Sequence, residues 1–187
     1  MERGITVAQG RRKLERHLAG LDAPGGLSQR MRVLIEDMRL QWCELDRRIA
    51  ELDKELTEWV RNEEAALRLM TIPGIGVLNA TALIAAIGQG ESFARGRDLA
   101  AWLGLVPRQL TTGGRPRLVG ISKRGNKYLR KLLIHGARAA LPTLLESPTS
   151  LGAWLRGLMT RMHKNAVVVA LANKLARMAW AVLRHGE

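Results

Sequence analysis

Residues 69–84 read Leu-Met-Thr-Ile-Pro-Gly-Ile-Gly-Val-Leu-Asn-Ala-Thr-Ala-Leu-Ile, and this stretch determines the fold that we expect. A proline ends one helix, two glycines allow a tight turn, and helical apolar spacing then resumes. Ile72 and Ile75 are expected to pack the turn against both helices. The pattern is that of a helix-hairpin-helix, in which Gly74, Ile75 and Gly76 bring backbone amides close to a phosphate. The alternative is a hairpin that only packs two helices together.

A heptad pattern lies upstream of this hairpin. Its apolar positions alternate at spacings of three and four: Ile35, Met38, Trp42, Leu45, Ile49, Leu52, Leu56 and Trp59. No proline or glycine interrupts residues 27–70, which predicts one long helix. Such a seam forms a coiled coil between two chains or half of an antiparallel pair within one chain. Residues 1–26 are broken by glycines and allow at most one short helix, around Arg11 to Ala19.

Downstream of the hairpin the sequence predicts further helices and one long loop. The expected helices cover residues 77–87, 97–103, 128–141, 151–162 and 166–183, the third of them stopping before Pro142. Residues 104–125 are expected to form a loop, with at most a short extended piece at 117–121. The class is therefore all-α: a long coiled-coil helix followed by a compact helical domain containing the helix-hairpin-helix. The expected divisions are a linker remnant at 1–26, the coiled-coil helix at 27–71 and the helical domain at 72–187.

The positive charge is concentrated in the second part of the chain. The 187 residues hold 30 Lys and Arg against 17 Asp and Glu, a net charge of +13. Residues 1–64 contain 12 basic and 13 acidic residues, whereas residues 65–187 contain 18 and 4. Between Asp98 and Glu146 there is no acidic residue at all. This one-sign block predicts a polyanionic partner, most simply DNA, with a membrane surface as the weaker alternative.

The centre of the basic block combines hydroxyls, glycines and cations. Such a loop can bind phosphate or hold a nucleophile flanked by cations. Thr111, Thr112 and Ser122 are the candidate catalytic hydroxyls. They can equally be turn and cap residues, because Ser122 or Asn126 is placed to cap the following helix. The candidate DNA-binding residues are Gly74, Ile75, Gly76, Arg108, Gly113, Gly114, Arg115, Arg117, Lys123, Arg124, Lys127, Arg130 and Lys131.

Several classes of protein are excluded by composition. A single cysteine, Cys43, makes no internal disulfide, so a reducing cytoplasm is the expected location. The N-terminus has no signal-peptide pattern, and the longest apolar run, residues 166–172, is short of the roughly 18 residues of a membrane span. No zinc-ligand spacing is present, and the few carboxylates of the basic half are not spaced as a two-metal site. We therefore expect no membrane association, no metal and no cofactor in this chain.

Four motifs in order carry a resemblance to a known family. They are Ile-Pro-Gly-Ile-Gly at 72–76, Leu-Ala-Ala-Trp-Leu-Gly-Leu-Val-Pro at 99–107, Thr-Thr-Gly-Gly at 111–114 and Gly-Ile-Ser-Lys-Arg-Gly-Asn-Lys-Tyr-Leu-Arg-Lys-Leu-Leu-Ile-His-Gly-Ala-Arg at 120–138. Together they resemble the C-terminal domain of DEDD-type insertion-sequence transposases, the recombinases guided by a bridge RNA. The resemblance covers nearly the whole chain, including the heptad helix.

The resemblance implies a two-part enzyme that cleaves and exchanges DNA strands. Its parts are a RuvC-like domain with four acidic ligands for Mg²⁺, a coiled coil that makes homo-oligomers, and a helical domain with a nucleophilic serine. Guide RNA is a further candidate partner. Met1 falls just after the expected end of the RuvC-like domain, so this chain is expected to be a truncated and inactive part. At the serine position stands Thr111, with Thr112 as the next choice. The alternative is a non-catalytic helix-hairpin-helix protein that binds DNA junctions.

Overall fold

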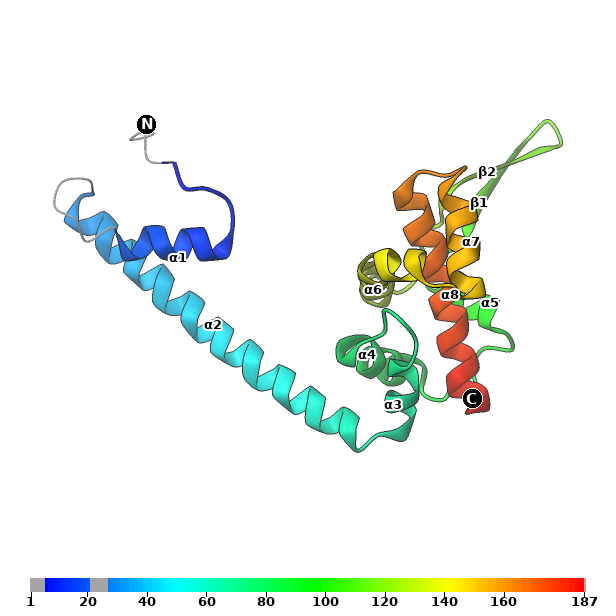
Figure 1. The fold of residues 1–187 in the computed structure, drawn as a ribbon, viewed down its shortest axis with the longest axis horizontal. Coiled ribbons are helices and arrows are strands. Elements are labelled where there is room, and N and C mark those ends of the chain that lie inside the picture. Colours follow the sequence, from blue (N-terminus) through cyan, green and yellow to red (C-terminus); the bar gives the residue numbers. More distant parts are fainter. Residues whose placement is uncertain (1–5, 21–26, 187) are drawn as a thin grey trace. The chain divides into compact units, whose positions relative to one another are not determined.

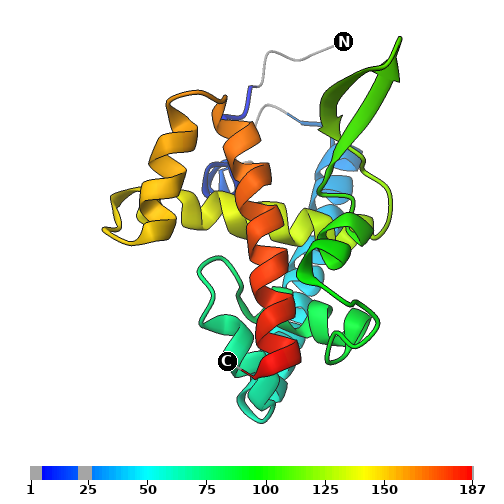
Figure 2. The ribbon, with the colours of Figure 1, turned by 90° about the vertical axis from the view of Figure 1, so that its right-hand side faces the viewer.

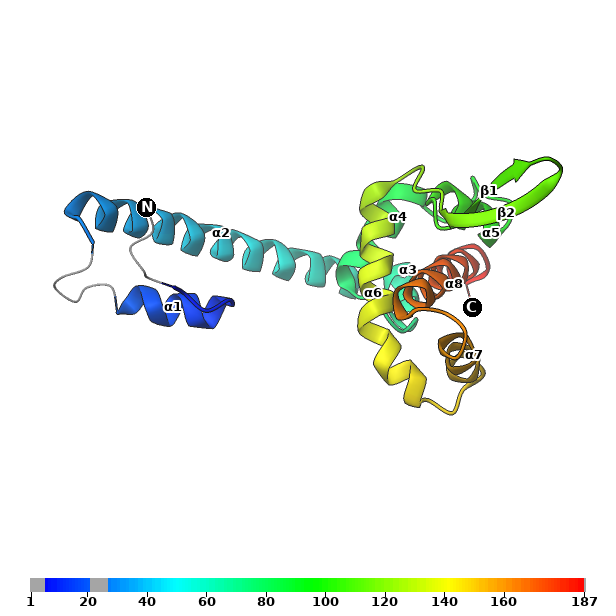
Figure 3. The ribbon, with the colours of Figure 1, turned by 90° about the horizontal axis from the view of Figure 1, so that it is seen from above.

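The computed structural model of the chain describes residues 6–20 and 27–186. In this part of the chain it is mostly helical, as predicted, with eight helices and one two-stranded sheet (Figures 1 and 3). The elements are α1 (Arg11–Ala19), α2 (Gln29–Arg61), α3 (Glu64–Met70), α4 (Val77–Ile87), α5 (Gly96–Trp102), β1 (Pro107–Thr112), β2 (Arg115–Ile121), α6 (Lys127–Glu146), α7 (Ser150–Met159) and α8 (Lys164–His185). The chain divides into two compact units, residues 1–53 and 54–187.

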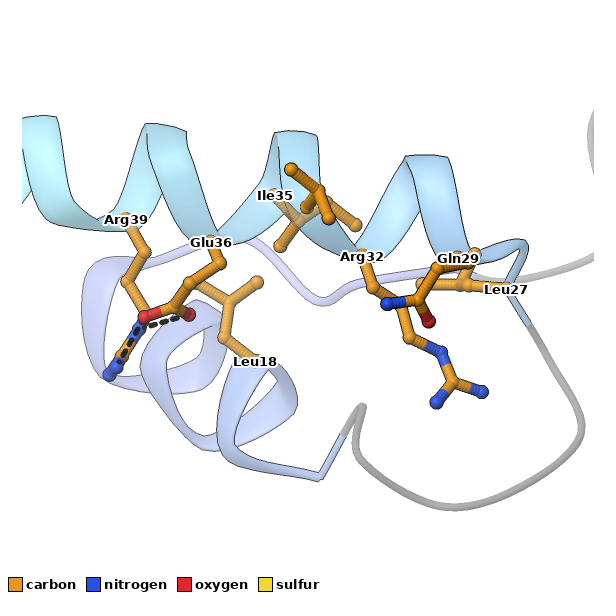
Figure 4. A pocket seen from close by; sticks show the side chains of 8 residues that line it. Leu18, Leu27, Gln29, Arg32, Ile35, Glu36 and Arg39 are labelled. Atoms are coloured by element: carbon orange, nitrogen blue, oxygen red, sulfur yellow. Dashed lines mark hydrogen bonds and ion pairs between the residues drawn. The ribbon is translucent and has the colours of Figure 1, made fainter.

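In the first unit, α1 packs antiparallel against α2. At one end of α1, the Arg11 guanidinium pairs with Asp46 at 2.6 Å and lies 5.1 Å from the centre of the Trp42 ring. At the other end, Leu18 lines a hollow together with Ile35 of α2 (Figure 4). The predicted short helix at Arg11 to Ala19 is confirmed, whereas residues 21–26 of the expected linker remnant lie outside the described residues. Side chains of α1 thus reach two seam residues of α2, Ile35 and Trp42.

Most other residues of the heptad seam are exposed. Met38, Leu45, Ile49 and Leu52 are 69%, 57%, 55% and 58% exposed. Burying a leucine or isoleucine side chain contributes about 1.5–3 kcal/mol. A row of such residues left in solvent therefore forms an apolar stripe suited to a further helix.

The long helix ends earlier than predicted. Residues 27–70 were expected to be continuous, but the helical hydrogen bonding is interrupted at Asn62 and Glu63, whose amides donate to carbonyls three residues back. At this point the Asn62 side chain donates to the Glu58 carbonyl at 3.1 Å, and asparagine has a lower helix propensity than the residues on either side of it. The separate helix α3 can then bury residues of its own, Ala65, Ala66 and Leu69.

The core of the second unit is built around α8. This helix buries eight side chains and contacts α3, α5, α6 and α7 (Figure 2). By length and composition alone α8 would pass as a membrane span, the one such helix in the described residues. Its buried side chains pack into the protein core, among them Leu171, Leu175 and Ala179.

Helix α6 continues through Pro142, contrary to the prediction that it stops there. A proline inside a helix removes one hydrogen bond and destabilises it by about 3 kcal/mol. Here Leu141 and Leu144, on either side of the proline, are buried in the core, while Pro142 itself is exposed. The packing of these leucines outweighs the loss at Pro142.

The predicted loop at 104–125 contains a β-hairpin. β1 and β2 pair antiparallel and are joined by Gly113 and Gly114, whose φ angles are 56° and 75°. Positive φ at both positions is the requirement of the two-residue turn that suits a hairpin. Most side chains on both faces of the hairpin are exposed. The strands therefore lack the apolar and polar alternation by which a strand is recognised.

Candidate nucleic-acid interface

The register of the hairpin sorts its side chains onto two different faces. Directly paired residues share a face, and successive residues of a strand alternate between faces. One face carries Arg108, Leu110, Thr112, Arg115, Arg117 and Val119. The opposite face carries Gln109, Thr111, Pro116 and Leu118. All three hairpin arginines thus lie on one face, which we call the arginine face.

The two candidate threonines lie on opposite faces of the hairpin. Thr112 pairs with Arg115 on the arginine face, and Thr111 pairs with Pro116 on the other. The Thr111 hydroxyl accepts a hydrogen bond from the side chain of Gln109 at 3.2 Å. Both threonines are exposed beside the glycine turn. A single phosphate held by the arginine face would therefore meet Thr112 rather than Thr111.

The base of the hairpin is locked by two glycines. Gly104 and Gly125 have φ angles of 71° and 83°, which only glycine adopts readily. A Cβ on Gly125 would overlap the carbonyl of Trp102, and one on Gly104 would overlap the carbonyl of Arg124. The two chain segments entering and leaving the hairpin are therefore in backbone contact.

Arg130 links the same two segments. Its Nη1 donates to the carbonyl of Leu103 at 2.9 Å and to that of Arg124 at 3.1 Å. The side chain is 9% exposed. Of the cations assigned to the interface from the sequence, Arg130 thus does not lie on the surface, because its guanidinium joins backbone carbonyls inside the domain.

The remaining predicted cations are exposed on the hairpin and on the segment that follows it. They are Arg108, Arg115, Arg117, Lys123, Arg124, Lys127 and Lys131. In the part of the chain that the structure describes, none of the three hairpin arginines pairs with a carboxylate. Lys123 adopts a φ of 56°, the one positive value among described residues other than glycine. These exposed cations form a continuous basic segment from β1 to the first turns of α6.

Asn126 begins α6 and caps it. Its Oδ1 accepts hydrogen bonds from the amides of Tyr128 at 3.0 Å and Leu129 at 3.1 Å. Of the two cap candidates, Asn126 and Ser122, the structure therefore selects Asn126. Ser122 is half-buried at the end of the hairpin, where its backbone amide donates to the Val106 carbonyl at 2.8 Å.

The predicted helix-hairpin-helix is formed by α3, the turn at 71–76 and α4. Ile72 and Ile75 are each 4% exposed, as expected of residues that pack the turn. Gly74 has a φ of 91°, and a Cβ there would lie 2.6 Å from the carbonyl oxygen of Gly136 in α6. The Gly74 carbonyl also accepts from Asn79 Nδ2 at 3.0 Å. This glycine therefore serves close packing.

Gly76 differs from its neighbours in the turn. It is exposed at the N-terminus of α4, and no atom lies within 4 Å of a Cβ built on it. Three residues of the helix-hairpin-helix turn were assigned to DNA from the sequence. Of these, only Gly76 has an open backbone, since Ile75 is buried and Gly74 packs against Gly136.

An apolar hollow under the hairpin was not predicted from the sequence. It has a volume of about 650 Å³, and its lining includes Val119, Ile121, Trp154, Met162 and Val169. These residues come from β2, from α7 and α8, and from the turn between these helices, so no local pattern could have linked them. The hollow separates the base of the hairpin from the first half of α8.

The described residues do not fit a magnesium site. Among them, no three His, Cys, Asp or Glu side chains lie close enough together to hold a metal ion. Glu91 is engaged by Arg184 at 3.6 Å.

The amino-acid sequence was compared with known protein families. Residues 66–149 match the family described as Transposase IS116/IS110/IS902 family. The matched range begins in α3, includes the hairpin and the whole of α6, and ends at the residue that caps α7. The chain carries a transposase domain of the IS116/IS110/IS902 family.

Individual relatives of this family align with most or all of the chain. A probable family 20 transposase of Pseudomonas aeruginosa is 45% identical over 86% of the chain and 47% of its own length. The transposase for insertion sequence element IS1328 of Yersinia enterocolitica is 40% identical over 100% of the chain and 55% of its own length. The transposase for IS1111A of Coxiella burnetii is 38% identical over 100% and 52%. The chain thus spans about half the length of the curated relatives it matches.

Proposed function

We propose that residues 65–187 hold DNA, duplex or branched, during the strand cleavage and exchange of insertion-sequence transposition. The observation that carries this proposal is the arginine face, on which Arg108, Arg115 and Arg117 are exposed without carboxylate partners among the described residues. Guanidinium groups bind phosphate oxygens bidentately. Contacts of this kind hold the DNA backbone without reading its bases. The family of the domain supports the same substrate.

The hairpin would act as an arm that brings DNA to the hydroxyls at its tip. Gly104, Gly125 and Arg130 fix the base of the arm, so the arginines move with the domain core. Thr112 shares the arginine face and Thr111 does not. We therefore assign Thr112 as the hydroxyl beside a bound phosphate, in preference to Thr111.

Salt-dependent DNA binding tests this function. Replacing Arg115, Arg117, Lys123 and Arg124 with alanine should weaken duplex binding strongly at moderate salt. The slope of log K against log salt should fall by about 0.9 for each phosphate that the variant no longer neutralises. A control variant with Arg12 and Arg16 of α1 changed to alanine should retain both affinity and slope. Unchanged affinity in the quadruple variant would remove the arm from the interface.

Cleavage should require a second protein part. We propose that cleavage uses an acidic metal site that residues 1–187 do not supply, as the family resemblance implies; the described residues include no cluster of metal ligands. Residues 1–187 alone should leave the ends of the element intact, with or without magnesium. Supplying an acidic metal-binding domain in trans should give cleavage. A covalent protein–DNA adduct formed by the unaided chain would contradict this proposal and indicate a complete site in the helical domain.

The exposed stripe of α2 would join two copies of the chain. Ile49 and Leu52 are more than half exposed in the middle of the seam. Replacing both with aspartate would place unpaired carboxylates inside a helix–helix interface, which destabilises it by several kcal/mol. The unmutated protein should be a dimer by light scattering and the double variant a monomer. A monomeric unmutated protein would leave only the α1–α2 pair.

A further inference from the structure

A second group of unpaired cations lines a groove between α5 and α8. The groove, of about 390 Å³, is bordered by Arg95 and Arg97 at the start of α5 and by Lys174 and Arg177 on α8. Arg95, Arg97 and Arg177 are exposed, and Lys174 is half-buried. None of these residues belongs to the hairpin or to the segment that follows it. They also lie outside residues 99–145, the stretch without acidic residues.

The cations of this groove are held close together without a protein anion. No carboxylate among the described residues pairs with Arg95, Arg97 or Arg177. Asp98 lies next to them on α5 but does not line the groove. Like charges gathered around one hollow repel one another, and an anion between them would offset that repulsion.

The walls of the groove are fixed by tight packing. A Cβ on Gly96 would lie 3.1 Å from the carbonyl oxygen of Arg177 and 3.2 Å from the Trp180 ring, so a larger residue there would push α5 and α8 apart by a few tenths of an ångström. Trp180 Nε1 also donates to the carbonyls of Gly90 and Phe93, at 3.2 and 3.1 Å. These contacts join α8 to the segment before α5. The backbone positions of the groove cations are therefore fixed by the packing of α5 and the segment before it on α8.

The groove lies next to the base of the β-hairpin along α8. Asn173 Nδ2 donates to the Leu105 carbonyl at the base of the hairpin, at 3.3 Å, and the next residue, Lys174, lines the groove. Lys174 Nζ also lies 4.8 Å from the centre of the Trp154 ring, which borders the apolar hollow under the hairpin. The hairpin and α5 lie on the same side of α8 (Figure 2). One extended polyanion can therefore reach both.

We infer that Arg95, Arg97, Lys174 and Arg177 form a second phosphate-binding site for the DNA duplex that the arginine face engages. This inference rests on the proposed function and extends it to a surface on the other half of α8. The ligand is the phosphodiester backbone, because planar guanidinium groups fit phosphate oxygens and most protein contacts to DNA are made to phosphates. The duplex would run from the hairpin along α8 to α5.

A charge-removal series on the full chain tests the second site. The test variant replaces Arg95, Arg97 and Arg177 with glutamine and leaves Lys174, which also packs on Trp154. A control removes the same charge elsewhere, at Arg12, Arg16 and Arg30, which are exposed in the first unit. A third variant carries lysine at the three groove positions and so keeps the charge. Binding is measured by fluorescence anisotropy with a short DNA duplex and an RNA duplex of the same sequence, over about 50 to 200 mM salt.

The glutamine variant should bind DNA at least tenfold more weakly than the control variant. Its slope of log K against log salt should fall by about 2 to 3, at about 0.9 for each phosphate left without its cation. The lysine variant should keep most of the slope.

Three results would overturn the inference. Equal DNA affinity and slope in the glutamine and control variants would show that the groove carries no phosphate, even if the quadruple hairpin variant loses binding as proposed. Loss of RNA binding alone would assign the groove to RNA. A fall in thermal stability that the lysine variant shares would indicate a structural role. Absence of DNA binding by the unmutated protein is a different result, because it would refute the proposed function itself.

Discussion

Thr112 lies directly opposite Arg115 across the β1–β2 hairpin. The two residues flank the turn at Gly113 and Gly114, so a hydroxyl and a guanidinium leave the same face at the tip of the arm. Thr111, one residue earlier, leaves the other face beside Gln109. Successive residues of a strand point to opposite faces, so the structure places the two threonines on different faces. The sequence alone did not distinguish them.

Site-directed crosslinking should distinguish the two threonines. The sole cysteine, Cys43, is first changed to serine. Cysteine is then introduced at position 111 or 112 and exposed to DNA that carries an activated mixed disulfide on a tether at one phosphate, so that the protein thiolate displaces the leaving thiol. Thr112→Cys should form the protein–DNA disulfide several times faster than Thr111→Cys, because only position 112 shares the arginine face. Equal rates, or a faster reaction at position 111, would show that DNA does not lie on that face.

Gly136→Ala should destabilise the protein by about 3 kcal/mol, the upper part of the range for overpacking. A Cβ there would overlap the carbonyl oxygen of Gly74 and lie 2.9 Å from Asn79 Nδ2. Gly157→Ala is the matched control, since it is also helical but has no atom within 4 Å of the added Cβ. The control should stabilise by about 0.5–1 kcal/mol. Chemical denaturation of both variants gives the comparison, and equal stabilities would contradict the packing at Gly74.

Arg130→Gln should lower stability, whereas Lys131→Gln should lower DNA affinity. The buried Arg130 guanidinium donates to the carbonyls of Leu103 and Arg124, and each acceptor left unpaired costs about 1–3 kcal/mol. Lys131 is exposed on the next position of α6. Thermal unfolding and DNA titration are measured on both variants. If Arg130→Gln kept full stability and lost DNA affinity, the arginine would belong to the interface after all.

Asn126→Ala should destabilise the protein by about 1 kcal/mol through loss of the α6 cap. The Asn126 side chain accepts from the amides of Tyr128 and Leu129. Asn126→Asp keeps the acceptor and should retain most of the stability. Ser122→Ala should change stability much less, because Ser122 does not cap the helix. A larger effect at Ser122 than at Asn126 in urea unfolding would reverse this assignment.

The helix content of the first unit should decrease at low pH. Hydrogen bonds from Arg47 and then Arg48 lower the pKa of Glu44 from 4.5 to about 2. A carboxyl with a lowered pKa in the folded state stabilises it above the ordinary value, and this contribution is lost as the pH falls from about 4.5 to about 2. Helix content by circular dichroism should therefore decrease over this range, and less so at high salt. Glu44→Gln should remove part of the pH dependence, and an unchanged profile would exclude Glu44 as a source.

The helical core could be predicted because its patterns are local. The breaker at Pro73, Gly74 and Gly76 marked the helix-hairpin-helix, and the buried Ile72 and Ile75 confirmed the packing of the turn. The hairpin could not be predicted from alternation, because side chains such as Leu110 and Leu118 are exposed and impose no period. The double glycine at 113–114 was the one local signal for it.

The candidate site was predicted in part. Exposed cations such as Arg115 and Arg117 follow from the basic block, but the burial of Arg130 depends on the carbonyl of Leu103, 27 residues away. The groove cations Arg95 and Arg177 are likewise distant in sequence and line one groove because α5 packs closely on α8 at Gly96. Contacts of this range leave no trace in a local pattern.

The locked base of the hairpin makes the arm an exchangeable cassette. Residues 108–118 are all exposed, while Gly104, Gly125 and Arg130 hold the two ends together from below. Arms of different length and sequence could therefore be grafted between these ends without rebuilding the core. Chimeras with other arms would keep one scaffold and change only the exposed hairpin.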